Sequence, residues 1–176
     1  MRLWSALVIG SCVVVALAAA TQEHAPGDVA RRLVGSWRLV RYEAGAQGEP
    51  AAAIYGPNPS GRLMYDAAGR MSVHVVDPRR RKFVSDDRLV HTPEEVREAF
   101  DGYFGYFGTY TVDAAAGTVT HHIAAASFPN FAGTEQKRYF VLSGDRLELT
   151  TPPMLRGGKT VTVHVVWERE AGGTAR

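Results

Sequence analysis

Aromatic rings and hydrogen-bonding groups are concentrated in one part of the sequence, residues 100–138. It opens with six aromatic residues within eleven positions: Phe100, Tyr103, Phe104, Tyr106, Phe107 and Tyr110. His121 and Arg138 follow on segments that alternate apolar and polar residues, with residues 127–131 as a loop between them. A pocket for an apolar small molecule needs aromatic surface beside a few hydrogen-bonding groups. We therefore expect this part of the chain to form a ligand cavity.

Two polar side chains are the main candidates for orienting a ligand. His121 could hydrogen-bond a ligand or act as an acid–base group near neutral pH, or it could be a structural histidine tied to a neighbouring strand or to Asn130. Arg138 could hold a carboxylate through two parallel hydrogen bonds. The alternative for Arg138 is an internal ion pair with an acidic residue: Glu135, Glu148 or Asp113.

The full set of residues predicted to bind the ligand combines these polar groups with aromatic ones. It consists of Tyr103, Tyr106, Phe107, Tyr110, His121, Phe128, Asn130 and Arg138. The aromatic members could instead be plain core where a helix packs. The loop with Phe128 and Asn130 is interpreted as a rigid cavity mouth, or alternatively as a structural turn.

No reaction-specific motif is present. Serine-nucleophile motifs, phosphate-binding glycine loops and paired catalytic carboxylates are all missing from the sequence. His121 and His122 must diverge on a strand, so a metal site would need His74 or His164 from another strand. We therefore predict no metal and no cofactor.

The function favoured by these residues is binding or carriage of a small, mostly apolar ligand with a polar or acidic group. The alternative is a cofactor-free isomerase, cyclase or hydratase, in which His121 and Tyr110 act as the acid–base pair. A third possibility is an interaction module whose interior is simply packed. Binding is favoured over catalysis because nothing in the sequence specifies a reaction.

The residue pattern predicts one all-β domain at residues 31–170. Short alternating runs are separated by Gly, Pro, Asn and Asp, which is typical of an antiparallel barrel or sandwich. We expect a barrel of about eight to ten strands, preceded by a linker at residues 21–30 and followed by a disordered tail at residues 171–176. The length of 176 residues suits a single domain with a real core.

The alternation also predicts which side chains face the interior. Val119 and His121 share one face of a strand while His122 points the other way, and Arg138 shares a face with Phe140. If the apolar faces line the interior, His121 and Arg138 point inward. Polar groups in an apolar cavity are costly unless something hydrogen-bonds them, and a ligand is one such partner.

One short helix is predicted among the strands. Thr92 is suited to cap it, Pro93 fits its first turn, and Glu95 completes a capping box. An apolar stripe continues through Phe100 to Tyr103. We expect the helix to end near residue 104 and to lie across the barrel mouth or against its outer wall.

The first twenty residues have the layout of a secretory signal. A positive Arg2 is followed by an apolar run over residues 3–17 and by small residues up to Ala20. We expect cleavage near Ala20 and export to the periplasm or the exterior. A retained membrane anchor and lipid attachment at Cys12 are the alternatives. A cleaved chain would have no integral membrane segment, no cysteine and no disulfide.

Charge provides no sign of a nucleic-acid partner. The chain has 20 basic and 18 acidic residues, whereas nucleic-acid binders concentrate positive charge on one face. Residues 79–82 form the only basic run; we interpret it as a solvated loop, or alternatively as a rim that attracts an acidic ligand or anionic lipid. The predicted partner is a small hydrophobic molecule, bound by a monomer or homodimer.

Several segments resemble a known family. Gly35-Ser36-Trp37 resembles the Gly-x-Trp of lipocalins, whose Trp plugs one end of the barrel, and Arg169 could supply the Arg that stacks on it. Other segments resemble the bacterial and fungal lipocalin-like domain family: residues 33–40, 61–65, 69–72, 106–110, 117–121, 128–130 with Gly133, Gln136 and Arg138, 147–150 and 167–169. The resemblance covers nearly all of residues 31–169. It implies a β-barrel with a small-molecule cavity, without specifying a reaction.

Overall fold

The computed structural model describes residues 26–46 and 48–171. The predicted signal segment, its cleavage site and Cys12 lie outside this range, as does the predicted tail apart from residue 171. Within the described ranges, no helix is both long and apolar enough to cross a membrane.

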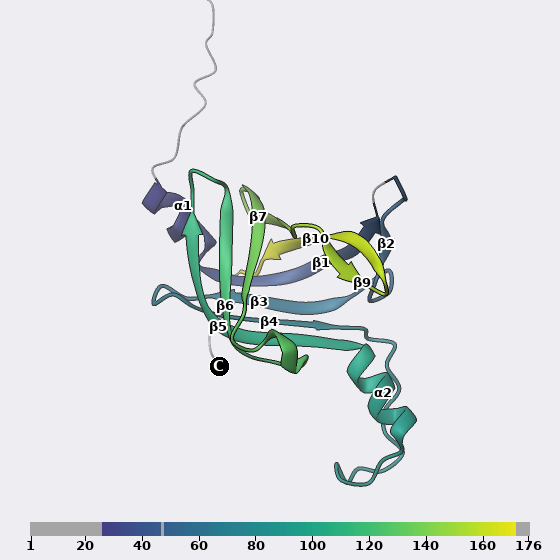
Figure 1. Cartoon of the computed structure of the whole chain (residues 1–176). Helices are drawn as coiled ribbons and strands as arrows, with labels where there is room; N and C mark the ends of the chain where they lie inside the picture. The colour runs from purple at the N-terminus through teal and green to yellow at the C-terminus, as the bar shows by residue number, and fades with distance from the viewer. Residues whose placement is uncertain (1–25, 47, 172–176) are drawn as a thin grey trace, which may run out of the picture.

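Ten antiparallel strands form one sheet that closes on itself (Figure 1). In chain order they are β1 (Gly35–Ala46), β2 (Ala52–Ala53), β3 (Ser60–Tyr65), β4 (Arg70–Val76), β5 (Tyr103–Asp113), β6 (Thr118–Ala126), β7 (Glu135–Ser143), β8 (Arg146–Thr150), β9 (Met154–Arg156) and β10 (Lys159–Arg169). Pairing of β1 with β10 along most of their length closes the barrel, and β2 and β9 are short additions to it. The predicted all-β barrel is confirmed.

Alternation along the strands sets the interior as predicted. In β6, Val119 and His121 are buried while His122 is half-exposed. In β7, Arg138 and Phe140 lie on the inner face and Lys137 on the exposed one. A single residue of slip would exchange these faces, so the paired registers of β6, β7 and β8 determine which side chains reach the cavity.

One end of the barrel is closed by Trp37. Its ring is 0% exposed, and its Nε1 donates a hydrogen bond of 2.9 Å to the Leu33 carbonyl. The Arg169 guanidinium lies 4.1 Å from the centre of this ring and donates to the carbonyls of Val34 and Arg32. The arginine therefore combines a cation–π contact with hydrogen bonds to the backbone that enters β1.

Gly35 makes this arrangement sterically feasible. Its φ is +143°, a backbone conformation that favours glycine, and a Cβ placed there would come within 2.6 Å of Arg169 Nη1. The Gly-x-Trp spacing thus brings the backbone close to Arg169 and, two residues later, places the Trp ring beneath it.

The described part of the predicted linker at residues 21–30 is helical. Residues 26–30 belong to helix α1 (Pro26–Leu33). Pro26 is compatible with this helix because proline is favoured in the first turn. Asp28 in the first turn and Arg31 in the last also match the helix dipole, and Leu33 is buried at the end of the helix.

The predicted helix is present as α2 (Pro93–Asp101), with its Thr92–Glu95 capping box complete. It ends at Asp101, before the expected residue 104, because Tyr103 is already paired with Val76 in the sheet. It also differs in placement: Figure 1 shows it projecting away from the barrel, and none of its residues is buried. Only its C-terminal end reaches the barrel mouth.

Two of the four cations in the basic run at residues 79–82 are paired with carboxylates. Arg79 pairs with Asp77 at 2.7 Å, and Arg81 pairs with Glu98 of α2 at 2.6 Å. Arg80 donates to the Ala99 carbonyl and lies over a tyrosine ring. The Arg79 and Arg81 charges are therefore paired with carboxylates, whereas Arg80 is held by a carbonyl and a ring.

Arg169→Ala should lower the free energy of unfolding by about 3 kcal/mol. The substitution removes a cation–π contact and charged hydrogen bonds to two part-buried carbonyls. Denaturant unfolding followed by tryptophan fluorescence would measure the change.

Arg38→Ala provides the control, because Arg38 lies on the same pair of strands and forms an exposed ion pair with Glu168. It should change the free energy of unfolding by less than about 1 kcal/mol. Equal losses in the two variants would contradict the role assigned to Arg169.

Candidate ligand-binding site

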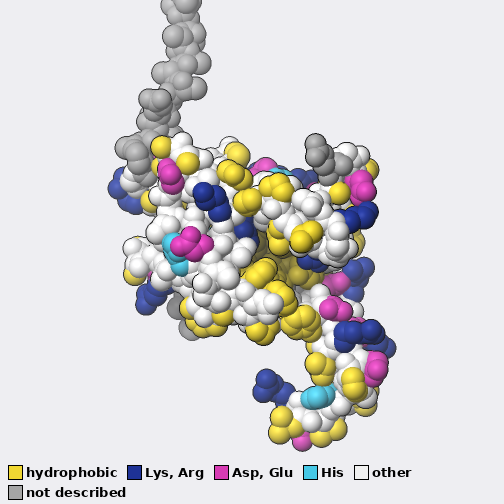
Figure 2. All heavy atoms as spheres, viewed as in Figure 1, with side chains coloured by type: hydrophobic (Ala, Val, Ile, Leu, Met, Phe, Trp, Pro, Cys, Tyr) yellow, Lys and Arg dark blue, Asp and Glu magenta, His cyan; other side chains and the backbone are white. Residues whose placement is uncertain are grey.

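A cavity of about 340 Å³ extends from Trp167 to the barrel end where α2, η1 (Pro129–Phe131) and β9 meet. Figure 2 shows hydrophobic side chains gathered around a hollow in this face of the barrel. Aliphatic side chains from the strands line its inner part, among them Val73, Val75 and Leu149. The predicted stretch of residues 100–138 therefore contributes to a cavity, together with strands from both sides of it.

Aromatic side chains form much of the mouth. Phe131 of η1 contacts Phe104 of β5 edge-to-face at 5.8 Å and Phe128 at 5.2 Å, measured between ring centres. Phe100 at the end of α2 completes this group. Pro129 sets the first turn of η1 and so holds Phe131 against the barrel. Edge-to-face aromatic pairs of this kind contribute stabilisation beyond that from burying their apolar surface.

Two arginines line the cavity without a carboxylate partner in the described part of the chain. Arg138, half-buried on β7, donates a hydrogen bond of 2.8 Å to the Lys137 carbonyl and also hydrogen-bonds the Tyr106 hydroxyl. Arg156 lies on β9 and hydrogen-bonds the Tyr55 hydroxyl. The two guanidinium charges therefore remain available to a ligand.

The internal ion pair considered for Arg138 is not formed. Two of its possible partners have others: Glu135 lies 3.1 Å from His122, and Glu148 pairs with Arg146 at 2.8 Å. Arg156 was not predicted as a cavity residue. It lies on β9, a short strand between a proline pair and a glycine pair, where no alternating pattern identifies a strand.

Both arginines act on Tyr42, which also lines the cavity. Burial raises the pKa of Tyr42 strongly and the neighbouring Tyr55 adds to this rise, while Arg138 and Arg156 oppose it. The rings of Tyr42 and Tyr55 meet edge-to-face with 5.1 Å between their centres. Tyr42 is thus a neutral hydroxyl within range of both positive charges.

His121 lies behind the cavity wall and is 1% exposed. Its Nε2 is 2.6 Å from the Tyr65 hydroxyl and its Nδ1 is 2.8 Å from the Tyr106 hydroxyl. Burial lowers its pKa to about 3, and the charge of Arg138 contributes. The ring is therefore neutral, with one nitrogen donating and the other accepting. Its role is to hold Tyr106 in the cavity wall; the alternative partner, Asn130, is not used.

The predicted ligand-binding residues divide into two groups. Four line the cavity: Tyr103, Tyr106, Phe128 and Arg138. Four lie elsewhere: Phe107, Tyr110, His121 and Asn130.

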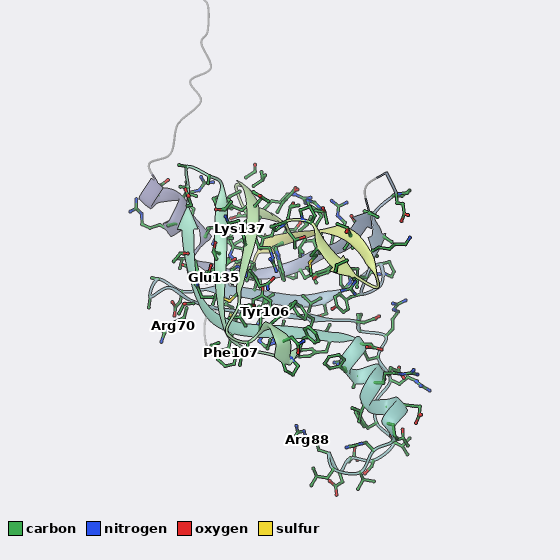
Figure 3. The ribbon with its side chains drawn as sticks, viewed as in Figure 1. Arg70, Arg88, Tyr106, Phe107, Glu135 and Lys137 are labelled. Carbon is green, nitrogen blue, oxygen red and sulfur yellow. The ribbon has the colours of Figure 1, made fainter. Side chains whose placement is uncertain are left out.

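The four that lie elsewhere do so for identifiable reasons. Phe107 follows Tyr106 on β5 and so faces outward, 56% exposed against 5% (Figure 3). Tyr110 lies opposite His121 in the β5–β6 ladder, but its hydroxyl donates to the Asp66 carbonyl, whereas the His121 ring bonds Tyr65 and Tyr106. Asn130 is exposed on η1. Aromatic composition alone did not separate the two faces of β5.

Residues 26–46 and 48–171 contain no group of three His, Cys, Asp or Glu side chains that could hold a metal ion. His122, on the outer face, has Thr111 and Glu135 as its neighbours instead.

Comparison with known proteins agrees with this architecture. Residues 34–170 match the lipocalin-like domain family. The chain belongs to that family. It is also similar to the 4′-hydroxy-3′-methoxypropiophenone carrier protein of Aspergillus oryzae (strain ATCC 42149 / RIB 40), with 32% identity over 106 residues, which is 56% of this chain and 96% of that protein. The predicted family resemblance is confirmed.

The buried His121 should make stability depend on pH. The unfolded chain protonates this residue below its ordinary pKa of 6.5, whereas the folded protein keeps it neutral down to a pKa of about 3. The unfolded state therefore binds more protons, and the free energy of unfolding should fall by about 2 kcal/mol from pH 7.5 to pH 5 through this group. Denaturant unfolding at the two pH values would measure it.

His121→Gln should lose most of this pH dependence, because an amide does not titrate. His122→Gln, on the outer face of the same strand, should retain it. If the free energy of unfolding fell equally on acidification in His121→Gln and in the unmodified protein, the burial of a neutral His121 would be contradicted. The NMR chemical shifts of the His121 ring nitrogens at pH 5 provide a second measurement. They report the protonation of the ring in the folded protein and do not depend on unfolding.

Proposed function

We propose that this protein carries a small, mostly apolar molecule with an acidic or polar group in its barrel cavity. The observation that supports it most directly is a cavity of about 340 Å³ with an aromatic mouth and two arginines that have no carboxylate partner among residues 26–46 and 48–171. The carrier of an aryl ketone to which the chain is similar adds support for small-molecule carriage as such.

The balance of interactions favours a ligand with one polar end. Burying apolar ligand surface against aliphatic and aromatic side chains supplies non-directional affinity. A guanidinium held partly out of water without a counter-charge is costly. A ligand carboxylate would offset that cost at Arg138 and could accept two parallel hydrogen bonds. The ligand's acid group would therefore orient it, and its apolar body would fill the remaining space.

The size of the cavity limits the ligand. Ligand pockets run from about 300 to 1,000 Å³, so 340 Å³ suits a molecule of one or two rings. The mouth combines Arg156 with the aromatic side chains around Phe131. These side chains can contact either an aromatic ring or a short alkyl chain.

Carriage is favoured over acid–base catalysis. The histidine considered as a catalyst has both ring nitrogens occupied by tyrosine hydroxyls and a pKa lowered to about 3. A general base needs a pKa near the working pH and a free path to the substrate proton. We also infer export, from the layout of residues 1–20.

Arg138→Ala should weaken binding of 4-phenylbutanoate about 10- to 100-fold and binding of its methyl ester by less than about 3-fold. The reason is that hydrogen bonds to a charged group contribute about 1.5–3 kcal/mol, and about 1.4 kcal/mol corresponds to tenfold in affinity. Isothermal titration calorimetry on the full chain would measure both ligands.

Lys137→Ala is the matched control, because this neighbouring cation lies on the outer face of β7. It should leave both affinities unchanged. Equal losses for acid and ester in Arg138→Ala would remove Arg138 from the role of charge partner. Failure of the unmodified protein to bind either molecule, with no small molecule found by native mass spectrometry of the protein from its own host, would overturn the proposal.

A further inference from the structure

The cavity wall contains one tyrosine whose hydroxyl has no partner. Four tyrosines line the cavity: Tyr42, Tyr55, Tyr103 and Tyr106. The hydroxyls of the last three bond other side chains of the wall or of its outer face: Tyr55 bonds Arg156, Tyr103 bonds His74, and Tyr106 bonds His121 and Arg138. Within residues 26–46 and 48–171, the Tyr42 hydroxyl forms no hydrogen bond. Tyrosine hydroxyls inside proteins usually find a partner, so this exception calls for a physical reason.

The Tyr42 hydroxyl is open to a molecule in the cavity. Part of the Tyr42 side chain remains accessible, although burial raises the pKa of its hydroxyl strongly. A side chain that is surrounded by protein and still accessible faces an internal space, and Tyr42 lines the cavity. In the described part of the chain, the side-chain atoms that are both sealed and unpartnered are Arg80 Nε and Trp167 Nε1. Tyr42 Oη is not one of them.

The charges around this hydroxyl favour an anionic partner. Burial is the main cause that raises the pKa of Tyr42, whereas the positive charges of Arg138 and Arg156 lower it. The carboxylate of the wall, Asp101, belongs to the end of α2 at the mouth, where it acts on Tyr55. Two cations near one neutral hydroxyl attract a negatively charged acceptor and repel a cation.

The ring of Tyr42 is held in place before any ligand arrives. Its backbone pairs with Val165 of β10, and its carbonyl accepts a hydrogen bond of 3.1 Å from the N–H of Ile54. Its ring lies edge-to-face with that of Tyr55, which is itself buried, with 5.1 Å between the ring centres. A donor fixed in this way loses little freedom on binding.

We propose that the Tyr42 hydroxyl donates a hydrogen bond to the carboxylate of the bound ligand, so that Tyr42 and Arg138 hold this one group together. The proposal rests on the proposed function, since it requires that the cavity hold a small molecule. It narrows the ligand class to ionised carboxylic acids with an apolar body. A carboxylate has lone pairs for several donors at once, whereas an amine would meet donors and positive charge.

Tyr42→Phe tests the hydroxyl directly, because it keeps the ring and removes only the oxygen. It should weaken binding of 4-phenylbutanoate about 10-fold, near the lower end of the range for hydrogen bonds to charged groups. Binding of butylbenzene, which has a similar apolar body and no acceptor, should change by less than about 2-fold, because the ring still packs against it. Isothermal titration calorimetry on the full chain would measure both.

Tyr139→Phe is the matched control. Tyr139 lies on the outer face of β7 and is 51% exposed. The same loss of one hydroxyl at this position should leave both affinities unchanged.

A double variant tests whether the two residues share one ligand group. Residues that act on the same group are not additive. In the Arg138→Ala background, Tyr42→Phe should therefore weaken 4-phenylbutanoate binding clearly less than the factor of about 10 expected in the unmodified protein.

The unmodified protein provides an independent measurement. With ¹³C at the ring carbon that bears the hydroxyl, carbon spectra of the full chain contain one resonance for each of its seven tyrosines, and Tyr42→Phe identifies that of Tyr42. Donation to a carboxylate should move this resonance downfield with 4-phenylbutanoate, and by clearly more than with butylbenzene.

The outcomes that would overturn the proposal are distinguishable. If Tyr42→Phe left 4-phenylbutanoate binding unchanged, or weakened both molecules equally, the hydroxyl would not be a ligand donor, although carriage would stand. If the effects of Tyr42→Phe and Arg138→Ala were fully additive, the two residues would not share the carboxylate. If neither molecule bound the unmodified protein, the proposed function itself would fail and this inference with it.

Discussion

Closure of one barrel end by Trp37 is the constraint on which the cavity depends. The barrel wall is continuous because β1 pairs with β10. The plugged end lies where β1 begins and β10 ends, since Trp37 pairs with Arg169. There the Arg169 guanidinium covers the Trp37 ring while bonding to the carbonyls that connect α1 to β1. Because this end is filled, the apolar side chains above it can leave space toward the other end without opening a channel through the protein.

Above the plug, the interior combines a rigid neutral layer with a charged one. Tyr65, His121 and Tyr106 form a chain of two hydrogen bonds in which the imidazole uses both nitrogens. A fully satisfied buried network of this kind fixes side-chain positions and carries no net charge. Arg138 then supplies positive charge within the cavity wall itself. The two layers join at the Tyr106 hydroxyl, which bonds both His121 and Arg138, so the neutral network also holds the charged side chain in the wall.

The sequence predicted the barrel and the inward faces of β6 and β7, because alternating strands fix side-chain direction once one face is apolar. It also predicted α2 through its capping box. The sequence did not predict side-chain direction correctly where that direction depends on strand pairing rather than on the local residue pattern. Phe107 and Tyr106 are both aromatic, and only the register of β5 against β4 places one outside and the other inside.

The remaining errors have similar causes. Arg156 lies on a strand of three residues, too short to show alternation, and it reaches the cavity only because β9 pairs with β10. Tyr103 was assigned to the helix because it continues an apolar stripe, but pairing with Val76 draws it into the sheet. The unpaired indole of Trp167 is invisible to any sequence argument, since it follows from what surrounds one nitrogen atom.

The cavity mouth and the barrel plug are built from different kinds of element. Long paired strands and a cation–π contact form the plug, whereas the mouth is assembled from the end of α2, a single 3₁₀ turn and the three residues of β9. Substitutions at the mouth therefore disturb few ladder hydrogen bonds. A barrel divided in this way can acquire new ligand preferences at its entrance during evolution while the elements that hold it folded remain unchanged.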